Sequence, residues 1–238
     1  MRKVLITGGT RGIGRALVET FLQNGDEVAF IYRDSSDKAA ELSRAGAVAF
    51  CCDLAKPEQV EKTCIEVLTL FGSPDVFISN AGVSSFSLFT EFTNEEWARV
   101  RSVNLDAPVL ITRAMLPGMI AKKYGRIVYI SSMWGQVGAS CEVAYSAAKA
   151  ALLGLTKALA KEVGPSGITV NCVCPGVIDT DMNAHLDAQT LRELQDETPL
   201  QRLGTPEETA KLCAYLCSDD ASFITGQVVG INGGFVVT

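Results

Sequence analysis

The chain has 238 residues, of which 47% are hydrophobic and 20% are charged, and its formal net charge is -6. This composition is typical of a globular protein, and the acidic balance argues against nucleic acid and anionic membranes as partners. Eight cysteines form no C-x-x-C pair and accompany one histidine, His185, so we expect no metal site and a reducing cytoplasm. No apolar run approaches the roughly 18 residues of a membrane span, and the run after Met1 is too short for a signal peptide.

The first predicted element is a short strand, residues 3–7, which leads into a glycine-rich turn and then a helical pattern. The turn contains Gly8, Gly12 and Gly14 in a G-x3-G-x-G spacing. Backbone amides of such a turn, together with the helix N-terminus, can approach a phosphate closely. The segment alone indicates a phosphate cradle, with a plain tight turn as the alternative.

A second apolar strand, residues 28–32, ends at Tyr32-Arg33. An acidic side chain at this place would accept the ribose 2'-OH of NAD, whereas a basic one suits the 2'-phosphate of NADP. Arg33, with Arg11 in the glycine turn, favours NADP(H). Asp34 leaves NAD open, since a different loop conformation would turn it onto the ribose.

Further apolar runs predict strands at residues 47–52, 75–79, 125–131, 168–173 and 226–231. Helical patterns lie at residues 57–71 and 206–217. Two more helical regions are predicted, one that starts at residue 93 and one that follows the strand 125–131 and ends near residue 163. This alternation predicts one α/β domain over residues 1–238. We expect a doubly wound Rossmann fold with about seven mostly parallel strands and helices on both faces. Residues 176–200 are polar and weakly periodic, which predicts a mobile substrate loop with His185 at its surface.

Two helical features have alternative interpretations. The helix that ends near residue 163 carries small apolar residues that suit either core packing or, as we favour, a subunit interface; they are Ala148, Ala151, Leu152, Leu155, Ala158 and Leu159. Asn104 lies inside an otherwise apolar helix, where it is either a satisfied buried amide or a functional residue.

Three polar residues have the spacing of a proton-transfer site. Tyr145 and Lys149 are four residues apart, which places them on one helix face. Ser132 directly follows a predicted buried strand, at the sheet edge that faces the ligand crevice. An ammonium about 4 Å away is worth roughly 4 kcal/mol at an effective dielectric of about 20, or about three pKa units of a tyrosine. The alternative is a packed helix with a solvated lysine.

Together these segments resemble the short-chain dehydrogenase/reductase family over essentially the whole chain. The matching motifs are TGGTRGIG at residues 7–14, Asp53-Leu54, Asn80-Ala81-Gly82, Asn104, Ser132, Tyr145-x3-Lys149 and Pro175-Gly176-x-Ile178-x-Thr180. Each motif is short, but their occurrence together, in order and at the family's spacing, is specific. The resemblance implies an NADP-dependent oxidoreductase acting on CH-OH and C=O groups.

The family mechanism, carried onto this sequence, implies that Tyr145 protonates the carbonyl oxygen as hydride arrives from the nicotinamide, while Ser132 polarises that oxygen. Lys149 would hold the nicotinamide ribose and lower the Tyr145 pKa, and Asn104 would support a water chain that resupplies the proton. The resemblance assigns the cofactor to Gly8, Thr10, Arg11, Gly12, Ile13, Gly14, Arg33, Asp53, Leu54, Asn80, Ala81, Gly82, Tyr145, Lys149, Pro175, Gly176, Ile178 and Thr180. Within this set, the resemblance puts Arg11, Gly14 and Arg33 near the phosphates and Asp53 on the adenine. It puts Asn80 by the adenosine ribose, and Ile178 with Thr180 at the carboxamide.

Residues 199–234 are most similar to bacterial 3-oxoacyl-(acyl-carrier-protein) reductases of fatty acid biosynthesis, and the family implies a homotetramer. Two departures bear on an acyl carrier protein as partner. Those reductases commonly have an Arg-Asp pair about two residues after Asn-Ala-Gly, whereas residues 83–86 here read VSSF, and they often have a basic residue where this chain has Ser166. Lys122 and Lys123 remain as contacts for an acidic carrier.

The segment 131–149 is also similar to a Gram-positive branch that reduces a 5-aminopentanone modification on elongation factor P. That substrate is a ketone on a lysine side chain, and Glu142 would meet its amine, with Trp134 beside the catalytic serine. Other small ketones or hydroxysteroids are a further alternative as substrates. A different interpretation is a non-catalytic NADP-sensing protein, against which the intact Ser, Tyr, Lys and Asn set argues.

Overall fold

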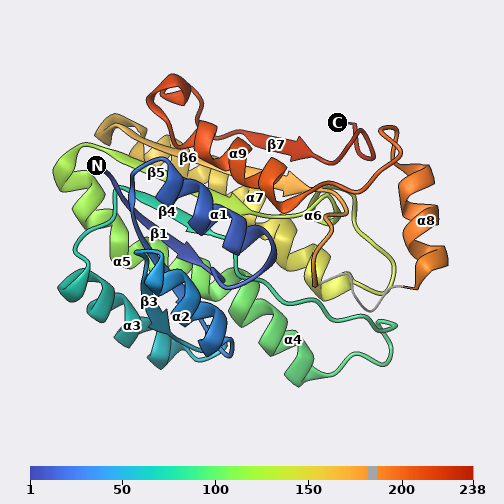
Figure 1. Cartoon of the computed structure of the whole chain (residues 1–238). Coiled ribbons are helices and arrows are strands. Elements are labelled where there is room, and N and C mark those ends of the chain that lie inside the picture. The colour runs from blue at the N-terminus through green and yellow to red at the C-terminus, as the bar shows by residue number, and fades with distance from the viewer. Residues whose placement is uncertain (182–186, 238) are drawn as a thin grey trace.

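The computed structural model describes residues 1–181 and 187–237 and shows one seven-stranded sheet between two layers of helices (Figure 1). The strand order is β3-β2-β1-β4-β5-β6-β7, and every neighbouring pair is parallel. The strands are β1 (Lys3–Thr7), β2 (Glu27–Tyr32), β3 (Val48–Cys51), β4 (Val76–Ser79), β5 (Gly125–Ile130), β6 (Ile168–Pro175) and β7 (Val228–Ile231). The predicted doubly wound Rossmann fold is therefore confirmed.

The strands are almost continuously apolar because both faces of the sheet are covered. Successive side chains of β1 enter different cores: Leu5 joins one, whereas Val4 and Ile6 join the other. The first core is covered by α3 (Pro57–Leu70), α5 (Ala107–Lys122) and α7 (Val143–Val163). The second is covered by α1 (Gly12–Gln23), α2 (Ser36–Arg44) and α9 (Pro206–Leu216).

The boundaries of the predicted strands and helices lie within two residues of those in the structure. The helix α2 was not predicted, and a further difference lies in the region between β6 and α9. There, the structure has a helix, α8 (Ala188–Glu197), inside the segment that we predicted as an irregular substrate loop. Asp187 begins this helix by accepting a hydrogen bond from the Thr190 amide at 2.7 Å. His185 lies outside the described residues.

The small-residue face of α7 contributes to the core at two of its positions. Ala148 and Leu152 are buried at 6% and 1% exposure, whereas Leu155 and Leu159 are partly buried against the first core. Core packing therefore accounts for these positions, and the predicted subunit interface stays a prediction. No helix in the described part of the chain is long and apolar enough to cross a membrane.

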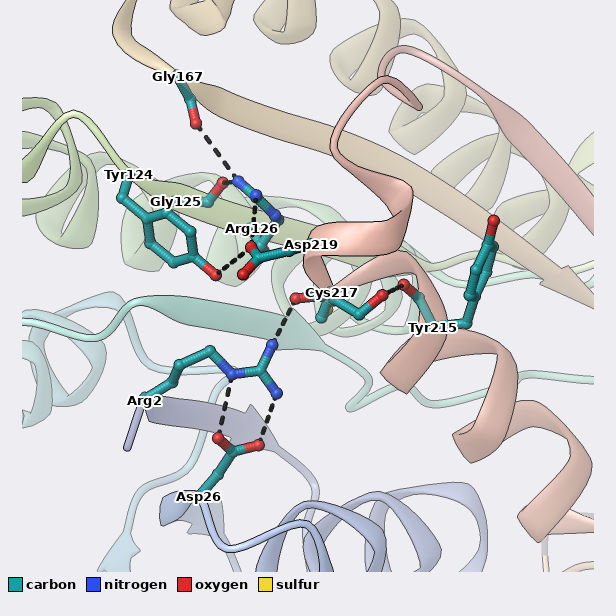
Figure 2. A network of polar contacts seen from close by, with 10 residues as sticks. Arg2, Asp26, Tyr124, Gly125, Arg126, Gly167, Tyr215, Cys217 and Asp219 are labelled. Atoms are coloured by element: carbon teal, nitrogen blue, oxygen red, sulfur yellow. Dashed lines mark hydrogen bonds and ion pairs between the residues drawn. The ribbon is translucent and has the colours of Figure 1, made fainter.

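A polar network holds the amino edge of the sheet, opposite the edge toward which the strands run (Figure 2). The Arg2 guanidinium donates to both carboxylate oxygens of Asp26, at 3.0 and 2.7 Å, and to the Cys217 carbonyl at 2.6 Å. These contacts tie the start of β1 to the turn before β2 and to the end of α9.

Arg126, the second residue of β5, is a buried cation in this network. Its side chain is 5% exposed and pairs with Asp219 at 3.3 Å, in the short helix η4 (Asp219–Ala221). It also stacks on the Tyr124 ring at 4.4 Å and donates to the Gly167 carbonyl at 3.4 Å. The guanidinium thus joins β5, the turn before β6 and η4.

We expect Asp219→Ala to lower the free energy of unfolding by about 1 kcal/mol, because the buried Arg126 guanidinium loses its carboxylate while the exposed side of the pair is screened by water. Urea unfolding measures the change. Asp220→Ala, at the neighbouring exposed residue, is the control and should have less than about half that effect. Equal stabilities of the two variants would contradict this account.

Candidate active site

Ser132 stands two residues beyond β5, at the carboxyl edge of the sheet. It is buried, at 7% exposure, and its Oγ accepts a hydrogen bond from the Trp134 amide at 3.1 Å. Trp134 begins a short helix, α6 (Trp134–Val137). The preceding residue, Ser131, donates from its Oγ to the Lys149 carbonyl at 2.8 Å, so the serine loop and α7 are bonded directly.

Tyr145 projects from the first turns of α7 and interacts with the Ser132 hydroxyl. Burial raises the pKa of Tyr145 to about 12, the hydrogen bond from Ser132 opposes this shift, and the negative charge of Glu142 adds to it. The phenol therefore keeps its proton at neutral pH. A buried, protonated phenol beside a hydroxyl is suited to donate a proton to a carbonyl oxygen.

Lys149 lies one turn further along α7, as its spacing predicts, with its Nζ 5.6 Å from the centroid of the Tyr145 ring. The Nζ donates to the Ile130 carbonyl at 2.7 Å. Burial lowers the pKa of Lys149 to about 8. Burial is the largest influence on the pKa of Tyr145 in this structure, and the expectation that Lys149 lowers this pKa stays a prediction.

Asn104 is fully buried in η1 (Ser102–Asp106), a π-helical turn between α4 (Asn94–Arg101) and α5. Its amide accepts from the Val83 N–H and donates to the Val83 carbonyl, both at 2.8 Å. Asn104 and Lys149 both lie close to Gly82: a Cβ added to this glycine would be 3.1 Å from Asn104 Oδ1 and 3.3 Å from Lys149 Nζ. The amide is satisfied and adjoins the lysine; its role in a water chain stays a prediction.

The glycine-rich turn has the shape of a cradle for a phosphate. A Cβ at Gly14 would overlap the Gly8 carbonyl oxygen, so α1 can start this close to β1 only with glycine there. Arg11 caps α1 without a side-chain hydrogen bond to its first amides, which leaves these donors for an anion. The turn therefore fits the pyrophosphate of the dinucleotide that the family resemblance implies.

Two strand ends hold this turn in place. The Thr7 Oγ1 accepts from the amides of Asn80 and Ala81, both at 3.0 Å, and the Asn80 side chain donates to the Thr7 carbonyl at 3.0 Å. On the far side, a Cβ at Gly12 would lie 3.1 Å from Thr180 Cγ2. The predicted residues after β1, β4 and β6 are thus gathered at one place. Thr7 was not predicted, although a threonine that ends a strand before a glycine turn is a usable signal.

The loop after β6 closes against the serine loop and against α2. The Pro175 carbonyl accepts from the Met133 amide at 2.9 Å, and the Gly176 amide donates to Ile231 at 3.0 Å. Further along, Lys38 of α2 pairs with Asp181 at 3.7 Å. Sequence reasoning missed these bonds because they connect residues that are far apart in the chain.

The predicted adenosine side lies at the ends of β2 and β3. Asp53 accepts from the Ala55 amide through its Oδ1 at 3.0 Å, and its own amide donates to Gln59. Arg33 is half exposed and forms an ion pair with the neighbouring Asp34. Arg33 and Asp34, which bear on the choice between NADP and NAD, are therefore both at this edge and in contact with each other.

The remaining predicted residues are buried or partly buried around the site. Thr10 is buried in the glycine turn, Ile13 and Leu54 pack against the two cores, and Ile178 is buried beside Gly204.

The comparisons with known proteins agree with this geometry. Residues 8–236 match the family model described as "Enoyl-(Acyl carrier protein) reductase". The chain is 39% identical to the 3-oxoacyl-(acyl-carrier-protein) reductase FabG of Aquifex aeolicus over 97% of this chain and 95% of that protein. It is 39% identical to the acetoacetyl-CoA reductase of Rhizobium meliloti, and 38% identical to a Bacillus subtilis protein named "Uncharacterized oxidoreductase YmfI", over 98% of both chains in each case.

The buried ammonium of Lys149 predicts a pH-dependent cost to stability. Its pKa falls from 10.5 to about 8 on folding, so the cost is complete below about pH 8 and disappears as the pH rises toward about 10.5. We expect Lys149→Met to be more stable than the wild type near pH 7, by at most about 3 kcal/mol, with the gain shrinking between about pH 8 and 10. Urea unfolding across this range measures it.

The matched control is Lys157→Met, which removes an exposed lysine from the same helix and should leave the stability nearly unchanged at every pH. A gain in Lys149→Met that did not vary with pH would contradict the assignment to the ammonium.

Proposed function

The chain belongs to the short-chain dehydrogenase/reductase family, and on that premise we propose that it uses NADPH to reduce the ketone of a 3-oxoacyl thioester. The observation that carries the proposal is the protonated Tyr145 phenol beside the Ser132 hydroxyl, at the sheet edge that also holds the glycine turn. The relatives named as 3-oxoacyl-(acyl-carrier-protein) and acetoacetyl-CoA reductases support the thioester substrate.

In this proposal, a bound nicotinamide supplies the hydride that adds to the carbonyl carbon. The Ser132 hydroxyl donates a hydrogen bond to the carbonyl oxygen, since its own Oγ already accepts from the Trp134 amide. Tyr145 transfers its proton to that oxygen, so a C=O group becomes CH-OH and a phenolate remains. Lys149 stabilises the phenolate by its charge, and Asn104 supports the resupply of the proton.

The residues that would hold the cofactor follow the sheet edge. The amides of the glycine turn, with Arg11, would take the pyrophosphate, and Asp53 and Asn80 the adenosine. Lys149 would also bond the nicotinamide ribose, with Ile178 and Thr180 at the carboxamide. We further propose a homotetramer in the cytoplasm, and an acyl carrier protein or coenzyme A as the carrier of the thioester.

A second candidate substrate is a ketone that carries an amine, such as the 5-aminopentanone group on elongation factor P. The observation that favours it is Glu142, whose negative charge acts on Tyr145 from three residues away and would attract a cation. A non-catalytic NADP-sensing role has less support, because a sensor has no use for a protonated phenol beside Ser132.

The decisive test measures NADPH oxidation with purified protein on acetoacetyl thioesters, a simple ketone and elongation factor P bearing the 5-aminopentanone group. We expect turnover of the thioesters, and a loss of about 10²- to 10⁴-fold in kcat for Tyr145→Phe, because the general acid is removed. NADPH binding by that variant, followed by fluorescence, should be retained.

Turnover of the modified elongation factor alone would replace the thioester by the second candidate. Tight NADPH binding without turnover of any carbonyl would instead support the sensor.

The preference for NADPH has its own test at Arg33. We expect Arg33→Ala to raise the KM for NADPH by about 10-fold or more while the KM for NADH changes little, because the 2'-phosphate loses a charge-assisted bond. The control is Arg15→Ala, since Arg15 on α1 pairs with Glu19 and Glu41 instead. If the wild type uses NADH as well as NADPH, Asp34 serves the ribose and the NADP assignment fails.

A further inference from the structure

Residues 232–236 form a tight turn at the carboxyl edge of the sheet, directly after β7. The Asn232 side chain donates to the Val236 carbonyl and accepts from the Gly234 amide, both at 3.0 Å, and its carbonyl accepts from the Phe235 amide at 3.1 Å. Figure 1 places this end of the chain at the edge toward which the strands point. The turn fixes the direction in which Phe235 leaves the sheet.

The turn is fitted closely against two segments that border the candidate site. A Cβ at Gly233 would lie 2.5 Å from Thr198 Cγ2, in the segment that follows α8, and the Leu200 amide donates to the Gly233 carbonyl at 3.2 Å. A Cβ at Gly176 would lie 2.8 Å from Asn232 Cα. The turn therefore has little freedom to move away from the site.

Phe235 reaches from this turn to the helix that follows the catalytic serine. Its ring contacts the Trp134 ring edge to face, with centroids 5.6 Å apart and planes at 90°. The Trp134 amide is the group that donates to Ser132 Oγ at 3.1 Å. A single residue thus joins the C-terminal turn to the hydroxyl that would polarise the substrate.

On its other side, α6 packs against α7, the helix that carries Lys149. A Cβ at Gly135 would lie 2.9 Å from the Lys149 carbonyl carbon and 2.7 Å from Ser131 Oγ. The Met133 amide also donates to the Pro175 carbonyl. The helix that orients Ser132 is therefore held between α7 and the C-terminal turn, and Phe235 supplies the second of these contacts.

We propose that Phe235 is a positioning residue, which holds α6 through Trp134 so that the Ser132 hydroxyl points at the carbonyl oxygen of the substrate. This inference rests on one part of the proposed function, that Ser132 acts on a carbonyl group, and it does not depend on which substrate contains that carbonyl. Without the ring, α6 keeps its contact with α7 but gains freedom on the opposite side, and the hydroxyl spends less time in the productive direction.

The kinetic test compares Phe235→Ala with the wild type on whichever carbonyl the wild type reduces. We expect kcat to fall about three- to tenfold, with the KM for NADPH within about twofold of the wild type, because an aromatic pair acts on the orientation of Ser132 and not on the cofactor. Phe235→Tyr keeps the ring and should retain the rate. Phe223→Ala removes a fully exposed phenylalanine and is the matched control.

A double-mutant cycle separates positioning from a general loss of structure. If Phe235 acts through Ser132, Phe235→Ala should cause almost no further loss of kcat in a Ser132→Ala background. The same factor in both backgrounds would overturn the proposal.

Hydrogen exchange gives a measurement that needs no turnover. In Phe235→Ala, peptides that cover residues 133–137 should exchange faster than in the wild type, because the Trp134 amide is held less tightly. Unchanged exchange would overturn the positioning role even if the rate fell. A wild type that reduced no carbonyl would reject the proposed function alone, and exchange would still decide the role of Phe235.

Discussion

The hydrogen bond between the Lys149 ammonium and the Ile130 carbonyl is the contact on which the candidate site depends. It attaches α7 to the end of the central strand β5, while Ser131 bonds the backbone of the same lysine. Two bonds at one residue therefore fix the distance between the strand that carries Ser132 and the helix that carries Tyr145. The site is built from α7 and β5 as a unit, with the cofactor residues added from the neighbouring strands.

This arrangement has a cost, because it keeps an ammonium and a phenol out of water. Burial shifts the pKa of each group in the direction that favours its neutral form: it lowers the pKa of Lys149 to about 8 and raises the pKa of Tyr145 to about 12. For carbonyl reduction, the neutral phenol is the useful state, since it retains the proton that the oxygen needs. Burial thus keeps the phenol in the protonated form that carbonyl reduction uses.

Local patterns were sufficient to predict the sheet and its parallel strands, because strands and helices alternate along the sequence. They also predicted that Tyr145 lies next to Lys149, because the two are four residues apart on a helix. The burial that raises the pKa of Tyr145 was not predicted, since burial depends on residues far away in the chain. The Asn104 partner, Val83, lies 21 residues away, and nothing local specifies it. The α8 helix was missed because its apolar face is narrow and none of its residues is buried.

The polar network of Arg2 and Arg126 and the candidate active site lie at opposite edges of the same sheet. β5 carries the buried Arg126 near its start and leads to Ser132 two residues beyond its end, so the charged network on one edge and the hydroxyl of Ser132 on the other lie on one continuous backbone. β5 pairs in parallel with β4 on one side and with β6 on the other. The loop that carries Ser132 is bonded to β6 through the Ser131 and Met133 amides. The helix α6 contacts the turn after β7 through Trp134 and Phe235, so the position of Ser132 depends on β6 and on this turn as well as on β5.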